Sequence, residues 1–306
     1  MARIVVAEAI AADGIMALRQ AGHEIVDLTG KPRAELLSTL AAADALIVRS
    51  QIQVDASLIA AGPQLKIIGR AGVGIDNIDA AAATRANIRV VNAPNGNTIA
   101  AAEQTFALLL ALARHVPRGD NSLRSGAWIR SELKGFELRG KQLGIIGFGR
   151  IGQAVAKRAA AFEMEVVASD PLISAQLAAQ YGVKLRSLEQ LLQESDIVSL
   201  HVPALGDRPL IGAVEIAKMK RGSILLNVAR GSLIDEAALA VALASGALGG
   251  AGIDVFASEP PIGSPLLEAP HTVLAPHLGA QTVDAQIAVA VEVAEQIVHF
   301  FSGTRD

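Results

Sequence analysis

Three polar side chains of complementary chemistry each follow an apolar, strand-like segment in the second half of the chain. Arg230 follows the run 224–229, Glu259 follows a segment that ends at 256, and His277 follows a third segment. Ligands bind open parallel sheets at the carboxyl ends of the strands, so these side chains are candidates for one site. An imidazole exchanges protons near neutral pH, a carboxylate orients it, and a guanidinium holds a substrate carboxylate through two hydrogen bonds. The trio suits the interconversion of an alcohol and a ketone.

Position alone leaves a structural role open for each of the three. Arg230 could bridge a loop, Glu259 could cap the proline-rich turn after it, and His277 could be a buried, hydrogen-bonded histidine. His201 also follows an apolar segment and could line a cofactor cleft without taking part in chemistry. The other histidines have no metal-like spacing, so no metal site is predicted. These are His23, His115, His271 and His299.

A glycine pattern predicts a dinucleotide site. Gly147, Gly149 and Gly152 form Gly-x-Gly-x-x-Gly between an apolar strand and the helical stretch 153–161. The first glycine permits the tight turn, the second lets a pyrophosphate approach the backbone, and the third lets helix and strand pack closely. The helix N-terminus adds oriented N–H groups for the anion.

Asp170 lies 18 residues after Gly152, at the end of the next predicted strand. A carboxylate there can accept hydrogen bonds from the adenosine ribose and would repel a 2′-phosphate. No cation follows within 171–173, so the pattern predicts NAD in preference to NADP.

Two other glycine-rich segments fit other known motifs poorly. Gly72-Val73-Gly74 follows a strand but has no third glycine, so a second dinucleotide site is not predicted there. The two glycines indicate a tight backbone turn near a ligand. The segment from Gly135 to Lys141 resembles the P-loop of nucleoside triphosphatases. It precedes a strand instead of following one, and Gln142 lacks the hydroxyl that a P-loop uses to bind Mg²⁺, so this class of enzyme is not predicted.

The elements that must position these side chains alternate along the chain. Short β-branched runs are separated by Ala- and Leu-rich helical stretches, which is typical of parallel sheets covered on both faces. We therefore predict the α/β class with two doubly wound parallel-sheet domains. The predicted strands are 4–7, 24–28, 45–49, 66–69, 88–92, 142–147, 165–169, 197–200, 223–228, 251–255 and 272–275. A helix is predicted from Ile99 to about Val116, and another over 283–301 has no following strand.

Composition limits the alternatives. The 306 residues carry 27 Lys and Arg against 30 Asp and Glu, and a chain so close to neutral lacks the dense positive charge of a sequence-independent nucleic-acid binder. Cysteine is absent, which removes thiolate chemistry and disulfides and fits a reducing compartment. No apolar run approaches the length needed to span a bilayer, so we expect a cytoplasmic protein without nucleic-acid or membrane partners.

Blocks along nearly the whole chain resemble the D-isomer-specific 2-hydroxyacid dehydrogenase family. The resemblance implies that His277 is the acid and base, that Glu259 is its partner, and that Arg230 binds the substrate. It also implies substrate contacts at Arg49, Ser50, Val73 and Gly74. The implied contacts with NAD are Gly147, Gly149, Arg150, Ile151, Gly152, Asp170, Val202, Val228, Ala229, Asp254 and Gly279. The blocks that carry the resemblance are 69–77, 92–94, 102–103, 147–152, 227–231, 252–256, 259–260 and 276–279.

The family's architecture explains the unplaced last helix. It implies that a Rossmann NAD-binding domain, 99–280, is inserted into a flavodoxin-like substrate domain made of 1–98 and 281–306. Closure of the two domains would exclude water from hydride transfer. Such enzymes are usually homodimers through the NAD-binding domain, with the region of Trp128 at the interface.

The implied substrate is a small anionic 2-hydroxy or 2-keto acid. Within the family the chain is most similar to members that oxidise 3-phospho-D-glycerate to 3-phosphohydroxypyruvate in serine biosynthesis. Gln51 stands where some of these enzymes have a second basic residue, which leaves glyoxylate or hydroxypyruvate reduction as an alternative. NAD-sensing corepressors that bind partner peptides are an alternative of another class. The longer members of the family have a C-terminal regulatory domain beyond the part that this sequence matches; feedback by serine is not expected if this sequence is the full protein.

Overall fold

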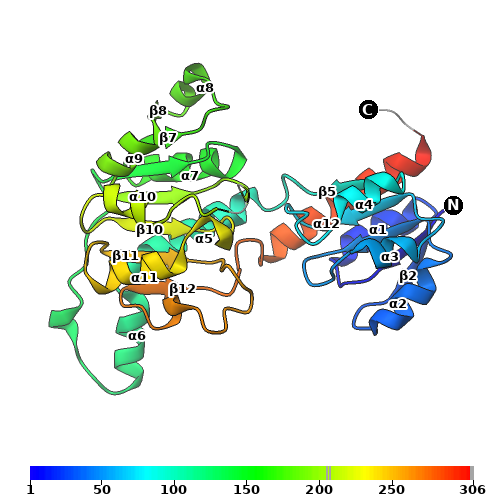
Figure 1. Ribbon diagram of the computed structural model, residues 1–306, viewed down its shortest axis with the longest axis horizontal. Coiled ribbons are helices and arrows are strands. Elements are labelled where there is room, and N and C mark those ends of the chain that lie inside the picture. The colour runs from blue at the N-terminus through cyan, green and yellow to red at the C-terminus, as the bar shows by residue number, and fades with distance from the viewer. Residues whose placement is uncertain (205, 207, 304–306) are drawn as a thin grey trace. The chain divides into compact units, whose positions relative to one another are not determined.

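The computed structural model describes residues 1–204, 206 and 208–303, and the chain divides into two compact units. Unit 1 comprises Met1–Thr98 with Ala280–Asp306, and unit 2 comprises Ile99–Gly279. Each unit contains one parallel sheet with helices packed on it (Figure 1). The predicted α/β class with two parallel sheets is confirmed. The last three residues of the predicted returning segment, 304–306, lie outside the described residues.

Unit 1 has five parallel strands in the order β2-β1-β3-β4-β5. This is the flavodoxin-like order, in which the chain changes direction across the sheet between β1 and β3. The strands are β1 (Arg3–Val6), β2 (Glu24–Asp27), β3 (Ala45–Val48), β4 (Ile67–Arg70) and β5 (Arg89–Asn92). The helices are α1 (Ala12–Gln20), α2 (Arg33–Leu40), α3 (Ala56–Ala60), α4 (Ala80–Arg85) and the returning α12 (Val283–Ser302).

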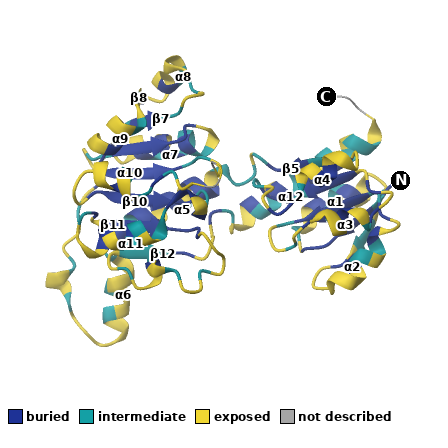
Figure 2. Ribbon diagram, viewed as in Figure 1, coloured by how far each residue is buried: buried dark blue, intermediate teal, exposed yellow. Residues whose placement is uncertain are grey.

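Helices cover both faces of this sheet, and the side chains of each strand alternate between the two faces. In β3, Leu46 and Val48 join the core with α2, α3 and α4, whereas Ala45 and Ile47 join the core with α1 and α12. Figure 2 shows the central strands β1, β3 and β4 as mostly buried and the outer surfaces of the helices as exposed. Helix α12, predicted from its apolar spacing, therefore completes one face of the unit 1 sheet.

The described residues of unit 2 form seven parallel strands in the order β12-β11-β10-β9-β6-β7-β8. The direction changes between β6 and β9, as in dinucleotide-binding folds. The strands are β6 (Gln142–Ile146), β7 (Glu165–Ser169), β8 (Lys184–Leu185), β9 (Ile197–Leu200), β10 (Ile224–Asn227), β11 (Gly250–Ile253) and β12 (Thr272–Leu274). The α-helices are α5 (Thr98–Ala113), α6 (Val116–Arg124), α7 (Arg150–Ala161), α8 (Ala175–Gln180), α9 (Leu188–Glu194), α10 (Ala213–Lys218) and α11 (Glu236–Ala244). The short 3₁₀ helices are η1 (Arg130–Glu132), η2 (Gly231–Leu233) and η3 (Pro265–Leu267).

The first helix of unit 2 ends earlier than predicted. Helix α5 stops at Ala113, His115 takes the left-handed conformation with φ 53°, and α6 then starts in a new direction. Pro117 has no N–H to donate to the Ala113 carbonyl, so a continuous helix would lose that bond. Phe136 donates its N–H to that carbonyl instead, at 3.0 Å. No single helix of the described chain is long and apolar enough to cross a membrane; α5 and α6 reach that length and composition only together, with a 61° bend between them.

Candidate active site

The predicted glycine turn joins β6 to α7. Gly147 has φ 91°, and a Cβ atom there would meet the His201 carbonyl oxygen at 2.5 Å. A Cβ atom on Gly152 would meet the Gly147 carbonyl oxygen at 2.2 Å, so only glycine allows α7 to pack this closely. Gly149 is the N-cap of α7, and a Cβ atom there would meet no other atom of the described residues within 4 Å. The turn therefore combines a crowded first and third glycine with an open second one, as phosphate binding at a helix N-terminus requires.

Asp170 follows β7 and is hydrogen-bonded to this turn. Its Oδ2 accepts the N–H of Phe148 at 2.8 Å, and its Oδ1 accepts the N–H of Leu172 at 2.8 Å. Each carboxylate oxygen has a second lone pair. Asp170 can therefore hold the glycine turn and still accept a hydrogen bond from a ribose hydroxyl.

His201 lies at the carboxyl end of β9, beside the glycine turn. Its N–H donates to the Ile146 carbonyl at 2.7 Å, and its Nε2 lies 2.8 Å from the Ser199 hydroxyl. Burial lowers the pKa of His201 to about 4. The ring is therefore neutral at physiological pH and is no candidate for proton exchange there.

The side chains of His277 and Glu259 are in contact. His277 Nδ1 lies 2.7 Å from Glu259 Oε2, and Glu259 Oε1 accepts the N–H of Phe256 at 3.1 Å. The His277 and Glu259 side chains are 49% and 38% exposed, so a small molecule can reach the pair. Because Nδ1 faces the carboxylate, it carries the proton of the neutral ring, and Nε2 is left to exchange a proton with a ligand.

Arg230 lies on a turn held by a buried side chain that the sequence reasoning did not single out. Asn227, 1% exposed, donates from Nδ2 to the Arg230 carbonyl at 2.9 Å and accepts the Ala229 N–H at 3.0 Å. The next residue, Gly231, lies so close to the Phe256 main chain that a Cβ atom would meet it at 1.9 Å. This close approach brings the Arg230 turn next to the segment that leads to Glu259.

Asp254 holds the loop that carries His277. Its carboxylate is fully buried and accepts the N–H groups of Leu278 and Gly279, both at 2.8 Å. Burial raises the pKa of this carboxyl, against the lowering effect of those hydrogen bonds. Gln104 of α5 donates a third bond at 3.1 Å. Gln104 is far from Asp254 in sequence and belongs to no chemical motif, so only the fold identifies it.

The other predicted cofactor residues also lie at the carboxyl edge of the unit 2 sheet. Arg150 is the exposed first residue of α7, and Ile151 is half-buried. Val202 lies against Gly147, since a Cβ atom on that glycine would meet Val202 Cγ1 at 2.6 Å. Val228 is buried and Ala229 half-buried, directly after β10.

The predicted substrate residues of unit 1 lie at the carboxyl ends of β3 and β4. Arg49 is half-buried and Ser50 exposed, and both follow β3. Val73 and Gly74 follow β4, and the Val73 carbonyl accepts a hydrogen bond from Asn92 at the end of β5. Two loops of the unit 1 sheet therefore present these residues at one edge.

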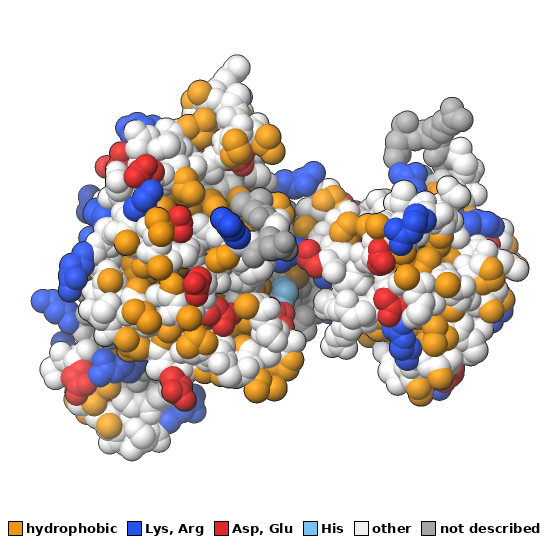
Figure 3. Space-filling model, in the orientation of Figure 1, with side chains coloured by type: hydrophobic (Ala, Val, Ile, Leu, Met, Phe, Trp, Pro, Cys, Tyr) orange, Lys and Arg blue, Asp and Glu red, His pale blue; other side chains and the backbone are white. Residues whose placement is uncertain are grey.

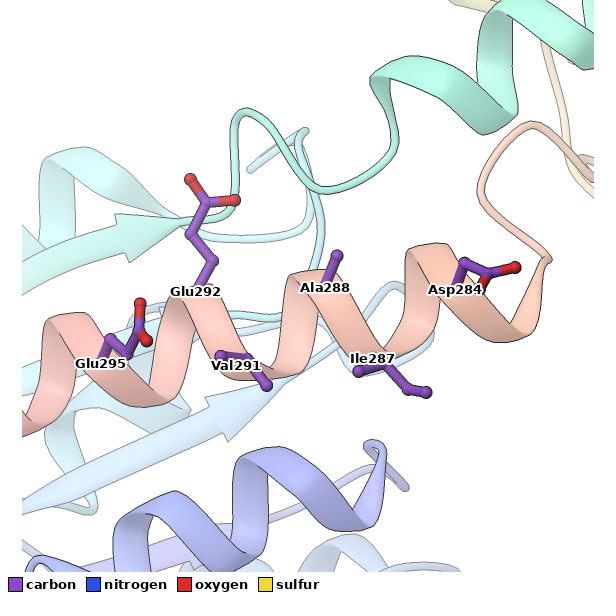
Figure 4. A pocket seen from close by; sticks show the side chains of 6 residues that line it. All are labelled: Asp284, Ile287, Ala288, Val291, Glu292 and Glu295. Atoms are coloured by element: carbon purple, nitrogen blue, oxygen red, sulfur yellow. The ribbon is translucent and has the colours of Figure 1, made fainter.

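Other surfaces offer less chemistry. On the face in Figure 3, acidic and basic side chains are interspersed over each unit. A surface hollow along α12 is lined by Asp284, Ile287, Ala288, Val291, Glu292 and Glu295 (Figure 4). Glu292 is already used there, because it accepts the Asn95 amide at 2.8 Å. Within 1–204, 206 and 208–303, no group of three His, Asp or Glu side chains is arranged to hold a metal ion.

Comparison with known proteins identifies the family. The family model described as "D-isomer specific 2-hydroxyacid dehydrogenase, NAD binding domain" matches residues 106–279, more than half of the chain. This chain belongs to that family. The predicted family and its cofactor, NAD, are thereby confirmed.

This chain spans different shares of the proteins that it is similar to. A D-3-phosphoglycerate dehydrogenase from Archaeoglobus fulgidus is 47% identical over 98% of this chain, but this chain spans only 58% of that protein. A crystal structure of a protein from Thermus thermophilus has a TM-score of 0.90 at 39% identity, over 99% of this chain and 98% of that one. An NAD-dependent formate dehydrogenase from Staphylococcus aureus, solved in complex with NAD, has a TM-score of 0.86 at 31% identity, over 99% and 97% of the two chains.

The residues of unit 2 fit NAD. The open backbone at Gly149 and the N-terminus of the 12-residue α7 suit a pyrophosphate, and Asp170 suits a ribose hydroxyl. Asp170 adds negative charge where NADP would place its 2′-phosphate, which favours NAD.

The lowered pKa of the half-buried His201 predicts a pH dependence of stability. The unfolded chain takes up a proton on this ring near pH 6.5 and the folded protein only near pH 4, so the free energy of unfolding falls as the pH drops through that range. In His201→Gln, the loss between pH 7 and pH 4.5 should be smaller than in the wild type by up to about 2 kcal/mol. Urea unfolding at both pH values measures this, with surface His271→Gln as the control. Equal losses in wild type and His201→Gln would contradict the assignment.

Proposed function

We propose that this chain interconverts a D-2-hydroxy acid and the corresponding 2-keto acid, using NAD. The pair 3-phospho-D-glycerate and 3-phosphohydroxypyruvate is the first choice of substrate. The observation that carries the proposal is the 2.7 Å contact between His277 and Glu259 at the carboxyl edge of the NAD-binding sheet. The similarity to a D-3-phosphoglycerate dehydrogenase supports the choice of acid.

His277 manages the proton in this proposal. In the oxidation direction its Nε2 accepts the proton of the substrate hydroxyl, and in reduction it returns that proton to the oxygen. Glu259 keeps the ring oriented through Nδ1 and stabilises the imidazolium that forms. Bound NAD supplies the hydride acceptor, and NADH the donor.

The substrate's anionic groups are bound by arginines. Arg230 holds the carboxylate and polarises the neighbouring carbonyl, since a guanidinium offers two parallel N–H donors. Val73 and Gly74 add main-chain contacts to the carboxylate. Arg49 and Ser50 bind the distal group of the acid, which is a phosphate in the first-choice substrate.

Hydroxypyruvate or glyoxylate is the second candidate substrate. Gln51 is exposed on the Arg49 loop and carries no charge. A phosphate bound there would therefore rely on fewer cations than in enzymes with a second basic residue, which favours a smaller, unphosphorylated acid.

An NADH absorbance assay with 3-phosphohydroxypyruvate, hydroxypyruvate, glyoxylate and pyruvate separates the candidates. Inactivity on all four would favour an NAD-sensing, peptide-binding role.

Replacing the proposed acid–base residue tests the mechanism. His277→Asn should lower kcat by about 10²–10⁴-fold with NADH binding nearly unchanged, because the proton step is lost while the dinucleotide site is not. His271→Asn is a matched control: His271 has a similar left-handed backbone, φ 57° against 55° for His277, but precedes β12 at the opposite edge of the sheet. Wild-type turnover in His277→Asn would refute the assignment.

Arg49→Ala tests the phosphate contact. Loss of a charge-assisted hydrogen bond, about 1.5–3 kcal/mol, should raise KM for 3-phosphohydroxypyruvate roughly 10- to 100-fold, with a much smaller effect on KM for hydroxypyruvate. Arg89→Ala, at the exposed amino end of β5, is the control. Equal effects on both acids would argue for an unphosphorylated substrate.

We also propose that the chain forms a homodimer through α6 and the segment after it. No residue of α6 is buried, and Val116, Leu123 and Trp128 are 57%, 60% and 78% exposed. Exposed apolar side chains rimmed by charged ones are typical of protein–protein contacts.

Trp128→Asp should therefore shift the sedimentation coefficient from dimer to monomer. Val241→Asp, which replaces a 69% exposed apolar residue on α11, should leave the dimer intact. A Trp128→Asp dimer would exclude this surface.

A further inference from the structure

Glu8 lies at the point in the unit 1 sheet where the strand order reverses. It follows β1, next to the end of β3, which is where open parallel sheets bind ligands. Its side chain is nevertheless turned into the protein, since the residue is only 9% exposed. A carboxylate in such a place is costly unless hydrogen bonds compensate its lost hydration.

The compensation comes from the loop that carries Arg49. Glu8 Oε2 accepts the Arg49 N–H at 2.6 Å and the Ile52 N–H at 3.3 Å, and Oε1 accepts the Gln51 N–H at 2.9 Å. One side chain therefore binds three of the four main-chain N–H groups of residues 49–52. Glu8 itself is 41 residues away from Arg49 in the sequence.

Asn77 holds the same loop by its carbonyl groups. This residue is also 9% exposed, and its Nδ2 donates to the Arg49 carbonyl at 2.9 Å and to the Ile52 carbonyl at 2.7 Å. A carboxylate and an amide thus fix the backbone at both ends of the loop.

This arrangement decides how the loop can bind an anion. The N–H groups of Arg49, Gln51 and Ile52 point to Glu8, so they are not available to a ligand. An anion is then left with the Ser50 N–H and with side chains, above all the guanidinium of Arg49, which also donates to the Ala9 carbonyl at 3.5 Å.

We propose that Glu8 is a positioning residue for substrate recognition: it fixes the 49–52 loop so that Arg49 and Ser50 meet the distal group of the 2-hydroxy acid. The inference rests on the proposed function and assigns Glu8 no contact with the substrate. It requires a carboxylate, because a carboxamide would replace one acceptor oxygen with an NH₂ donor that faces the N–H groups of the loop.

Glu8→Gln tests this with two measurements. Hydrogen exchange followed by NMR should be at least tenfold faster at the amides of Arg49, Gln51 and Ile52. KM for 3-phosphohydroxypyruvate should rise about tenfold or more, with kcat and KM for NADH within twofold of the wild type. Glu8→Asp, which keeps both oxygens on a shorter side chain, should show smaller changes in the same direction and decides the question if Glu8→Gln does not fold.

Asp44→Asn is the matched control. Asp44 precedes β3 at the opposite edge of the same sheet, accepts the Arg3 N–H at 2.9 Å and binds Lys66 at 2.8 Å. Its replacement should lower the thermal midpoint and leave KM for the keto acid unchanged. A rise in KM equal to that of Glu8→Gln would mean that general loosening of the unit is responsible, and would overturn the proposal.

The remaining outcomes are also decisive. Unchanged amide exchange in both Glu8 variants would show that Glu8 does not hold the loop, and faster exchange with unchanged KM would remove its role in recognition. If the wild type acts on none of the keto acids, the proposed function fails and the recognition role fails with it. Amide exchange still decides in that case whether Glu8 holds the loop, so the two failures are distinguishable.

Discussion

Main-chain N–H groups in the loops at the carboxyl ends of the strands need partners, and carboxylates supply them. Loops lack the regular ladders of helices and sheets, so their buried polar groups must be satisfied one by one. Glu8 holds the loop after β3, Asp170 holds the glycine turn after β6, and Asp254 holds the loop after β12. Each of these carboxylates follows one strand and binds the loop of another. Much of the geometry of the candidate site depends on this repeated interaction.

Asp254 has the most demanding position of the three. Its carboxylate is fully buried, yet it orders the residues directly after His277, and its own carbonyl accepts the His277 N–H at 2.8 Å. His277 has a left-handed backbone with φ 55°, which is uncommon outside glycine and persists where surrounding bonds impose it. The bonds from Asp254 provide that constraint. The exposed His277–Glu259 pair is thus supported by a buried carboxylate that is not itself accessible to a substrate.

The nested arrangement of the chain follows from packing within unit 1. The chain leaves this unit near Thr98 and returns near Ala280, and α12 then buries Val289, Val293 and Ile297 on the same face of the sheet as α1. Without α12, the apolar side chains of β1, β3 and β4 on that face would lose much of their cover. The returning helix is therefore part of the unit's core, which explains why an apolar helix without a following strand stands at this place in the sequence.

The sequence by itself determined the fold class, most of the strands, the glycine turn and the three side chains of the proposed chemistry. These features are local: hydrophobic periodicity marks each element, and Arg230, Glu259 and His277 each follow a strand. The end of α5 was predicted about three residues too late. Pro117 cannot donate an N–H to the Ala113 carbonyl, and the sequence does not show that Phe136, far along the chain, donates to that carbonyl instead.

Only the tertiary structure decided which side chains support the site. Asn227 lies within a family block, but Gln104 is 150 residues from Asp254, and Glu8 is 41 residues from the loop that it holds. No spacing in the sequence connects such pairs, because their contact results from the order of strands in a sheet. The carboxyl-end rule that selected Arg230 applies equally to Glu8, but whether a side chain there points to a ligand or to a neighbouring loop depends on the packing of the folded chain.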